Sequence, residues 1–351
     1  MIEVTVVFLD GSLPSTSIAP MEIFQYAGVL WNVLHGDPGQ PYFRVRTASL
    51  HGRAVQGDVP VAIQANCGIA EIRQTDLIVV PTAGMDLEAL CRQNAPLIPW
   101  LQHWRTRGAA IAGVCTGVSL LAEAGLLDGK PATTHWAVVD QCRRRYPAVQ
   151  WRPELFITEA DGVFCSGGLY SSIDLSQYLV EKYCGHQVAV ETAKALLIER
   201  PRTWQSGYAV EPPRWAHGDE QIQKAQDWLF RNFRHDVRFA DLAAHVGMTP
   251  RNFNRHFKAA TGDTPLGYLH RLRVSEARKI LEGQFKSVYE VGVAVGYQDL
   301  TFSRRLFKRY SGIAPQAYRQ RFGPKRRKGA IELRGTRGGR AVQAGTVNGQ
   351  A

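Results

Sequence analysis

The sequence has 351 residues, of which 45% are hydrophobic, enough for two domains with packed cores. It holds no apolar run of 18 residues, which excludes a membrane-spanning helix, and its start, MIEVTVVFLDGS, lacks the positive charge of a secretory signal. The net charge of +11 is uneven: residues 1–210 hold 16 Lys and Arg against 19 Asp and Glu, whereas residues 211–351 hold 26 against 12.

Short apolar runs alternate with helical patterns through the first two hundred residues. Four runs are rich in small or β-branched apolar residues, as expected of strands: 4–10, 76–82, 108–115 and 162–168. Helical periodicity falls between or after them, in segments 19–34, 87–107, 117–127, 136–146 and 171–185. Continuously apolar strands separated by helices predict a mostly parallel sheet covered on both faces, a three-layer α/β sandwich.

A cysteine ends the third predicted strand. In AAIAGVCTGVSLLAEAG (109–125), Cys115 is followed at once by a helical pattern, and Gly113 and Gly117 allow a sharp turn. Because sites form where parallel strands end, and because a helix N-terminus favours the thiolate, we expect Cys115 to be the most acidic and most reactive thiol. A buried, inert cysteine is the alternative.

The other cysteines suggest no further site. No spacing typical of a disulfide framework or a zinc site occurs, so we expect a cytoplasmic protein with reduced thiols and no metal. The six are at positions 67, 91, 115, 142, 165 and 184.

A change in pattern near residue 200 predicts the domain boundary. Residues 199–220, ERPRTWQSGYAVEPPRWAHGDE, are rich in Pro, Gly and Trp and lack periodicity, and only helices are predicted after them. We therefore predict an α/β domain at 1–198, a linker at 199–218 and an all-α domain at 219–323. The Gly- and Arg-rich residues 324–351 are expected to be a disordered tail, which either attracts phosphates or is simply a solvated terminus.

The helical part contains one pattern twice. FADLAAHVGMTPRNFNRHF (239–257) predicts helix, turn and helix, with Gly247 in the turn, Thr249 capping the second helix and Pro250 at its first position. SVYEVGVAVGYQDLTFSRRLFKRYSGIAPQAYRQRF (287–322) repeats this order, and an amphipathic helix joins the two units. Apolar residues expected to face inward are Leu242, Ala243, Val246, Phe253, Phe302 and Phe307.

These two units resemble the DNA-binding domain of the AraC/XylS family over residues 219–323. The resemblance implies that the second helix of each unit enters a major groove, where its first residues read bases. The implied base-reading residues are Arg251, Asn254 and Arg255 in the first unit and Leu300, Thr301, Arg304 and Arg305 in the second. Those implied to touch phosphates are Lys258, Lys308, Arg309 and Arg319. Leu300 has no polar side-chain atom and can at most pack on a thymine methyl.

The segment GVCTGVSLLAEAGLLDGKPATTHWA resembles the nucleophile turn of the ThiJ/PfpI branch of the type 1 glutamine amidotransferase-like superfamily. The likeness extends over about residues 1–195 and implies a flavodoxin-like or amidotransferase-like fold. It also implies a pocket in which His135, of Thr133-Thr134-His135, and Glu22, of PMEIF, face Cys115. The backbone amides of Gly84 and Thr116 would take the oxyanion-like positions.

Two departures from that family weaken a hydrolytic triad. Thr116 stands where PfpI-type proteases have a histidine after the cysteine, and His135-Trp136-Ala137 lacks the carboxylate of the amidotransferase His-x-Glu pair. Glu22, Cys115 and His135 could still serve lyase or hydratase chemistry. The alternatives are a hydrogen-bonded pocket wall for His135 and a charge at a helix N-terminus for Glu22.

Together the two resemblances imply a transcription regulator of the bacterial cytoplasm. Its first domain is expected to bind a small amine, amino acid or carbonyl metabolite through Glu22, Gly84, Cys115, Thr116 and His135, without a cofactor. Its second domain is expected to bind double-stranded promoter DNA as part of a homodimer, which contacts RNA polymerase if the protein is an activator. The alternative is a bifunctional protein whose Cys115 pocket retains hydratase, lyase or amidase-like activity.

Overall fold

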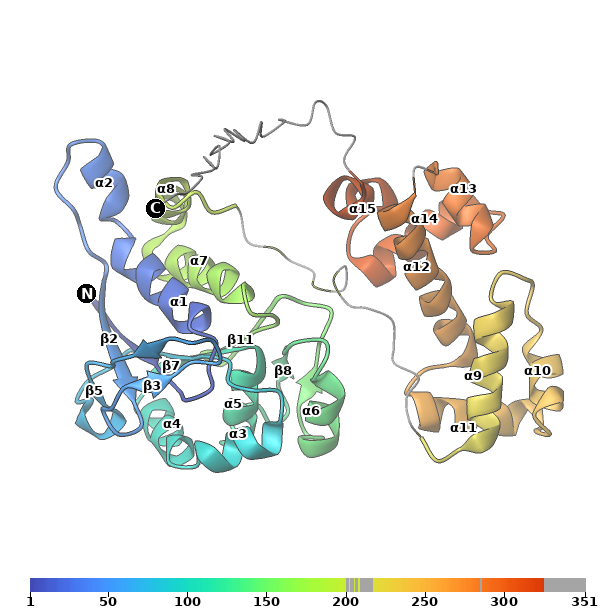
Figure 1. Ribbon diagram of the computed structural model, residues 1–351, viewed down its shortest axis with the longest axis horizontal. Helices are drawn as coiled ribbons and strands as arrows, with labels where there is room; N and C mark the ends of the chain where they lie inside the picture. The colour runs from blue at the N-terminus through green and yellow to red at the C-terminus, as the bar shows by residue number, and fades with distance from the viewer. Residues whose placement is uncertain (200–201, 203–204, 206–207, 209–216, 285, 325–351) are drawn as a thin grey trace, which may run out of the picture.

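The computed structural model describes residues 1–199, 202, 205, 208, 217–284 and 286–324. Strands and helices alternate up to α8 (His186–Ala195), and only helices follow from α9 (Glu220–Asn232) onward (Figure 1). The described part of the predicted linker is limited to residues 199, 202, 205, 208, 217 and 218, and the predicted tail lies outside the described residues except for residue 324. No helix in the described part is long and apolar enough to cross a membrane.

Seven strands form the main sheet of the first part. They are β1 (Ile2–Val7), β2 (Phe43–Ser49), β5 (Cys67–Gly68), β6 (Leu77–Val80), β7 (Ala110–Val114), β10 (Ile157–Ala160) and β11 (Val163–Ser166). The order is β10-β11-β7-β6-β1-β2-β5, and every neighbouring pair is parallel except β10 and β11. The five strands from β2 to β11 thus have the doubly wound order 2-1-3-4-5, which confirms the predicted α/β class.

Helices cover both faces of this sheet (Figure 1). On one face lie α1 (Ser15–Tyr26), α7 (Ser171–Cys184) and α8, and on the other α3 (Leu87–Gln93), α4 (Leu97–Thr106), α5 (Val118–Glu123) and α6 (Val139–Arg145). Residues of β1 point alternately into two cores. Val4 and Val6 belong to the core that includes residues of α1 and α7, and Val7 belongs to the core that includes residues of α3, α4 and α5. The apolar runs of the sequence therefore reflect a sheet that is buried on both sides.

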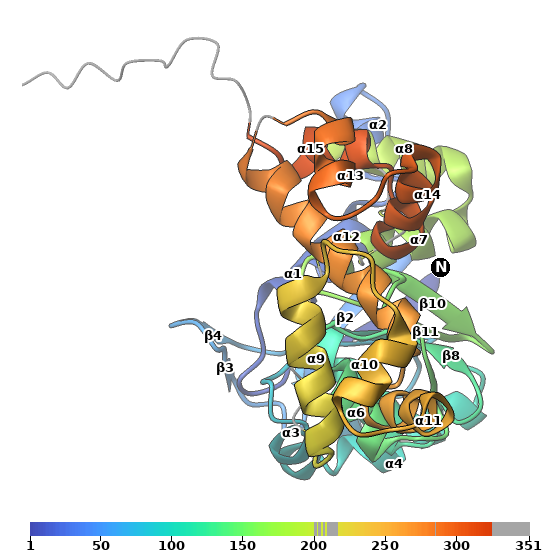
Figure 2. The same cartoon turned by 90° about the vertical axis from the view of Figure 1, so that its right-hand side faces the viewer.

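The structure divides two of the predicted helices and adds strands. The segment 19–34 forms α1, which begins earlier, and α2 (Leu30–Leu34); between them Gly28 has a φ of +73° and leaves no room for a Cβ atom. The segment 87–107 is divided between α3 and α4. Sequence periodicity did not predict β2, β5, β10, the parallel pair β8 (Pro131–Ala132) and β9 (Gln150–Trp151), or the hairpin of β3 (Val55–Gln56) and β4 (Ala62–Ile63), which projects at the edge of the molecule (Figure 2).

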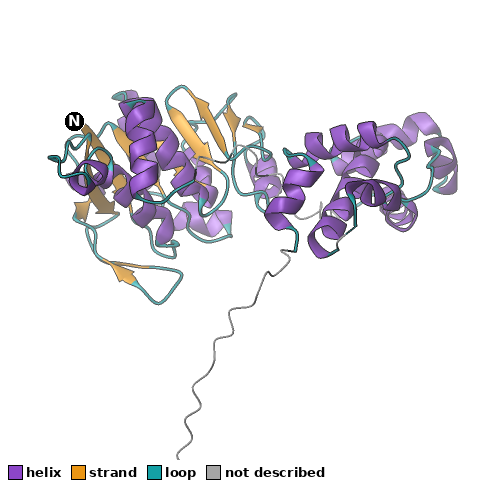
Figure 3. Cartoon of the chain, turned by 90° about the horizontal axis from the view of Figure 1, so that it is seen from above, coloured by secondary structure: helices purple, strands orange, loops and turns teal. Residues whose placement is uncertain are grey.

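The second part is helical throughout its described residues (Figure 3). The first unit comprises α10 (Phe239–His245) and α11 (Pro250–Thr261), the second α13 (Val288–Ala294) and α14 (Leu300–Ser311), with α12 (Pro265–Gly283) between them and α15 (Pro315–Phe322) at the end. Thr249 caps α11 through the N–H of Asn252, with Pro250 at the first position, as predicted. Phe253 and Phe307 are buried, and Phe302 is partly buried against the same core.

Two buried arginines connect α12 to the end of α9 and to the second unit. Arg273, which is 8% exposed, donates from Nε to the carbonyl of Phe233 at 2.7 Å and from Nη2 to that of His235 at 2.8 Å, at the C-terminal end of α9. Arg278 donates to Ser311 Oγ at 3.0 Å and to the carbonyl of Tyr310 at 2.7 Å, in the last turn of α14. Each cation thus satisfies backbone or hydroxyl acceptors at a helix C-terminus.

Candidate functional site

Cys115 lies at a sharp turn at the carboxyl edge of the sheet. Strand β7 ends at Val114, and a single 3-10 turn (Cys115–Gly117) leads into α5. Cys115 has a φ of +55°, a left-handed conformation that costs an ordinary residue about 1–2 kcal/mol. A Cβ atom on Gly117 would lie 2.2 Å from the carbonyl oxygen of Pro81, so only glycine fits there. The local geometry is that of a nucleophile elbow.

The environment of Cys115 nevertheless disfavours the thiolate. The residue is only 2% exposed, and burial raises the pKa of its thiol, against the weaker lowering effects of hydrogen bonds with the Thr82 side chain and the Thr116 backbone. The expectation of an unusually acidic thiol is therefore wrong. The following helix, α5, has six residues, and its N-terminus does not offset the loss of solvation.

Thiol labelling tests this correction. We expect iodoacetamide at pH 8 to modify the partly exposed Cys67 and Cys184 before Cys115, because alkylation requires both access and thiolate. Mass spectrometry of peptides over time would give the order, and the Cys115→Ser variant should lose none of the early label. Early modification of Cys115 would show that its burial is transient.

Thr116 belongs to a hydroxyl network rather than to an open surface. Its Oγ1 lies 2.6 Å from Thr82 Oγ1 and accepts the N–H of Ala83 at 3.2 Å. Thr134 completes the surroundings of the elbow by donating its hydroxyl to the carbonyl of Cys115 at 2.8 Å. These contacts join the ends of β6 and β7 to the segment that carries His135.

His135 lines a cavity of about 210 Å³ beside the elbow. Burial lowers the pKa of its imidazole, which favours the neutral ring. Because Nδ1 lies 3.1 Å from the N–H of Ala137 and accepts it, the neutral ring carries its proton on Nε2. The ring can therefore donate one hydrogen bond at neutral pH.

Glu22 is not among the residues that line this cavity. Thr16, Ser17, Pro20, Ile23 and Phe24 form the buried face of α1, and Glu22 falls outside this stripe with an exposed side chain. Gly84 is exposed too and has a φ of +66°.

Three residues of the predicted linker complete the cavity, and no motif or periodicity in the sequence indicates this role. Arg202, Gln205 and Tyr208 line it together with His135, Trp136, Phe156, Gly168, Leu169, Tyr170 and Ser171. The Arg202 guanidinium binds the buried Asp174 carboxylate of α7 at 2.6 Å and lies 4.5 Å from the centre of the Phe156 ring. Among the described residues that line the cavity, aromatic side chains are frequent, and the Arg202 guanidinium is already paired with Asp174. His, Cys, Asp and Glu side chains form no potential metal site within the described ranges.

The second candidate site is the basic surface of α11 and α14. Among the predicted DNA contacts, Leu300 and Arg319 are partly buried, and those exposed are Arg251, Asn254, Arg255, Lys258, Thr301, Arg304, Arg305, Lys308 and Arg309. The same spacing on both helices leaves a basic face opposite the apolar one. Asp299 caps α14 as Thr249 caps α11, so each helix begins at a fixed point.

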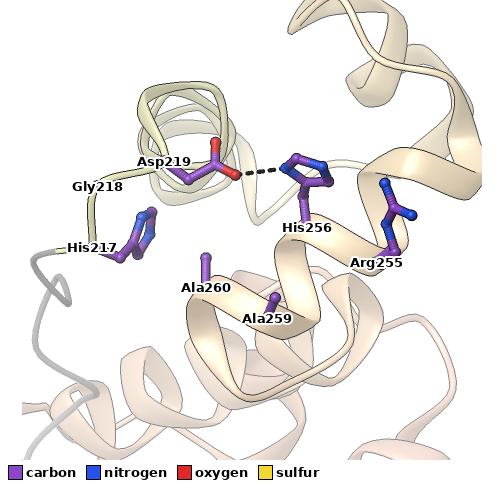
Figure 4. A pocket seen from close by; sticks show the side chains of 7 residues that line it. All are labelled: His217, Gly218, Asp219, Arg255, His256, Ala259 and Ala260. Carbon is purple, nitrogen blue, oxygen red and sulfur yellow. Dashed lines mark hydrogen bonds and ion pairs between the residues drawn. The ribbon is translucent and has the colours of Figure 1, made fainter.

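A hollow next to α11 shows how this helix is held (Figure 4). Asp219 caps α9 through the N–H of Ile222 and accepts from Nδ1 of His256 in α11 at 2.8 Å. Arg255, the neighbour of His256, borders the hollow and donates to Asn252 Oδ1 at 2.7 Å. The histidine therefore positions α11, whereas the arginine lies free of the core.

Comparisons with known proteins agree with this architecture. The model of the DJ-1/PfpI family matches residues 15–182, and a helix-turn-helix domain model matches residues 242–321. The first part of the chain is thus similar to the DJ-1/PfpI family, and the second part to helix-turn-helix domains.

Two relatives align with most of this chain. It is 26% identical to the HTH-type transcriptional regulator CdhR of Pseudomonas aeruginosa, over 81% of this chain and 82% of that protein. It is 26% identical to the HTH-type transcriptional regulator GbdR of the same species, over 80% and 76%. The DJ-1/PfpI domain is also similar to the crystal structure of Drosophila melanogaster DJ-1beta, with a TM-score of 0.48 and 19% identity over 56% of this chain and 98% of that one.

Proposed function

We propose that the protein is a sequence-specific transcription regulator that responds to a small metabolite. The observation that carries the proposal is the pair of capped basic helices, α11 and α14, repeated in one domain behind an α/β domain with its own cavity. Helices of this kind present exposed side chains to base edges in the major groove. The relatives named as transcriptional regulators support the same conclusion.

Selection from random-sequence duplexes followed by binding measurements would test DNA recognition. We expect Arg255→Ala to weaken binding to the selected site by about 1–3 kcal/mol and to relax the preference at one base pair, because a bidentate contact to a base is lost. Binding to random DNA should change much less. Both Arg255 and the surrounding face are exposed, so the fold should be unaffected.

Lys308→Ala serves as the matched comparison. An exposed lysine that contacts phosphate should weaken binding to selected and random duplexes alike, and should reduce the slope of log K against log salt by about one. Equal losses on both kinds of DNA for both variants would contradict the division into base-reading and phosphate-binding residues. Failure to select any sequence would refute the proposed function itself.

The remaining parts of the proposal concern the first domain and the assembly. We place the metabolite site at the carboxyl edge of the sheet, around Cys115, Thr116 and His135, with the amide of Gly84 as a further donor. We propose further that the protein acts in the bacterial cytoplasm, where promoter DNA is found. A homodimer, the domain limits predicted from the sequence, and a contact with RNA polymerase in the case of an activator stay predictions.

The strained conformation of Cys115 favours one alternative function. A φ of +55° is the signature of an elbow that presents a nucleophile, so hydratase, lyase or amidase-like turnover is the second candidate. The raised pKa and burial of the thiol argue against it. Steady turnover of a candidate metabolite that Cys115→Ser abolishes would establish this activity, and binding without turnover would exclude it for that metabolite.

A further inference from the structure

The side chain of Gln205 is buried in the first domain although it belongs to the predicted linker. It is 2% exposed, and its Nε2 donates to Thr133 Oγ1 at 3.0 Å and to the carbonyl of Thr134 at 2.8 Å. Its backbone N–H donates to the carbonyl of Glu154 at 2.9 Å. The primary carboxamide of Gln205 is thus hydrogen-bonded to the Thr133-Thr134-His135 segment of the first domain.

The place that holds this carboxamide has the features of a binding site. A Cβ atom on Gly167 would lie 2.4 Å from Gln205 Oε1, so the site has a glycine where the amide approaches the backbone. Because the Thr133 hydroxyl donates to the carbonyl of Leu155 at 2.8 Å, its oxygen is left to accept. The two acceptors, Thr133 Oγ1 and the Thr134 carbonyl, match the two hydrogens of an NH₂ group.

This cradle, formed by Thr133, Thr134 and Gly167, adjoins both the elbow and the cavity. Thr134 hydrogen-bonds to the carbonyl of Cys115, and the register of β7 and β11 pairs Val114 with Ser166, so that Cys115 and Gly167 follow paired residues. Gln205 and His135 line the same cavity of about 210 Å³. A molecule in the cavity could therefore place a polar group in the cradle if Gln205 withdrew.

We propose that the cradle is the recognition site for a small primary carboxamide, and that Gln205 occupies it as a tethered competitor. The proposal names a ligand class for the metabolite-responsive function. Carboxamide binding does not depend on that function, whereas an effect of the ligand on DNA binding does. A tether keeps Gln205 at a high effective concentration, so that a free ligand binds at least about tenfold more weakly than it would to an empty cradle.

Occupation of the cradle is linked to the helix-turn-helix domain through Tyr208. The N–H of Tyr208 donates to the carbonyl of Gln205, and its ring lies 5.6 Å from that of Phe156 and 5.1 Å from that of Phe322 in α15. Arg321 of α15 lies 5.1 Å from the same ring. A ligand that replaces Gln205 would thereby loosen a contact between the two domains, which is what a sensor requires.

The test uses the full-length chain with Gln205→Ala and acetamide as the probe, because acetamide restores the group that the substitution removes. Acetate, which has the same shape but no N–H, is the control ligand. Ligand-observed NMR should show that the variant binds acetamide at least about tenfold more tightly than the unmodified chain does. Acetate should bind the variant at least about tenfold more weakly than acetamide, since it has no hydrogen to donate to the two acceptors.

Three further variants make the result specific. Gln205→Glu keeps the size of the side chain but sets a carboxylate against two acceptors, so it should leave the cradle and allow acetamide to bind. Thr133→Val in the Gln205→Ala background removes one acceptor and should weaken acetamide binding. Gln150→Ala, at an exposed glutamine of the same domain, should create no acetamide binding.

Acetamide binding that is equal in the unmodified and Gln205→Ala chains, or acetate binding as tight as acetamide binding, would overturn the proposal. The affinity for the selected duplex provides the regulatory readout. We expect it to differ at least about threefold between the unmodified chain and Gln205→Ala, and an unchanged affinity would overturn the link through Tyr208. If the protein binds acetamide as described but selects no DNA sequence, the proposed function is refuted and the proposal of a carboxamide site is still supported.

Discussion

Arg273→Ala is expected to destabilise the helix-turn-helix domain by about 3–5 kcal/mol, because two hydrogen bonds from a buried cation are lost and two carbonyls are left without a partner. The guanidinium also lies 4.9 Å from the centre of the Tyr297 ring, so packing against the second unit is lost as well. Hydrogen exchange measured by mass spectrometry would show faster exchange in peptides from α9 to α15 and unchanged exchange in the sheet.

A neighbouring arginine provides the control for this result. Arg271, also in α12, forms a partly exposed ion pair with Asp263, which precedes the helix, and its substitution by alanine should cost no more than about 1 kcal/mol. Equal effects of the two substitutions would mean that helix propensity or net charge, rather than the bonds to Phe233 and His235, stabilises the domain.

The second large effect is expected at the elbow. Gly117→Ala should destabilise the DJ-1/PfpI domain by about 3 kcal/mol, because the new Cβ atom would lie 2.2 Å from a backbone oxygen, and both β6 and β7 would have to shift. Peptides from these two strands should exchange hydrogen faster, while those from α11 and α14 should not.

Gly84→Ala is the control, because it changes the backbone preference at a glycine with positive φ without causing a steric clash. Its φ of +66° is unfavourable for alanine, but nothing lies within 4 Å of the added atom, so we expect a cost of about 1–2 kcal/mol. If Gly117→Ala cost no more than Gly84→Ala, the turn could relax, and the elbow would be less rigid than its packing indicates.

Local signals were sufficient to predict the helix-turn-helix domain and the central strands. The cap at Thr249, the proline after it and the buried positions such as Phe253 appear where the sequence placed them. Strand β2 was missed because Arg44 and Arg46 interrupt its apolar residues, as happens in a strand near the edge of a sheet. The periodicity of residues 19–34 predicts one helix, because periodicity alone does not indicate the turn that Gly28 makes.

The predicted metabolite site stays a prediction. The structure brings the Thr133-Thr134-His135 segment to the turn of Cys115 through the hydrogen bond from the Thr134 hydroxyl to the Cys115 carbonyl, and His135 lines a cavity. The acidity of the thiol could not be predicted, because burial depends on residues distant in sequence. The same holds for Gln205 and Arg202, whose partners are 71 and 28 positions away and which stand in a stretch without periodicity.

The two buried arginines of α12 have a consequence for the DNA that the protein selects. They are five positions apart, which places them roughly 140° apart around an axis of roughly 28 Å, so each is directed to a different neighbour. These bonds hold α12 against the C-terminal end of α9 and the last turn of α14, and α11 packs against both α9 and α12. We therefore expect α11 and α14 to keep one separation and one rotational phase along the double helix. Under the proposed function, a metabolite signal should then move the domain as a whole, and the two half-motifs read by one chain should keep their spacing.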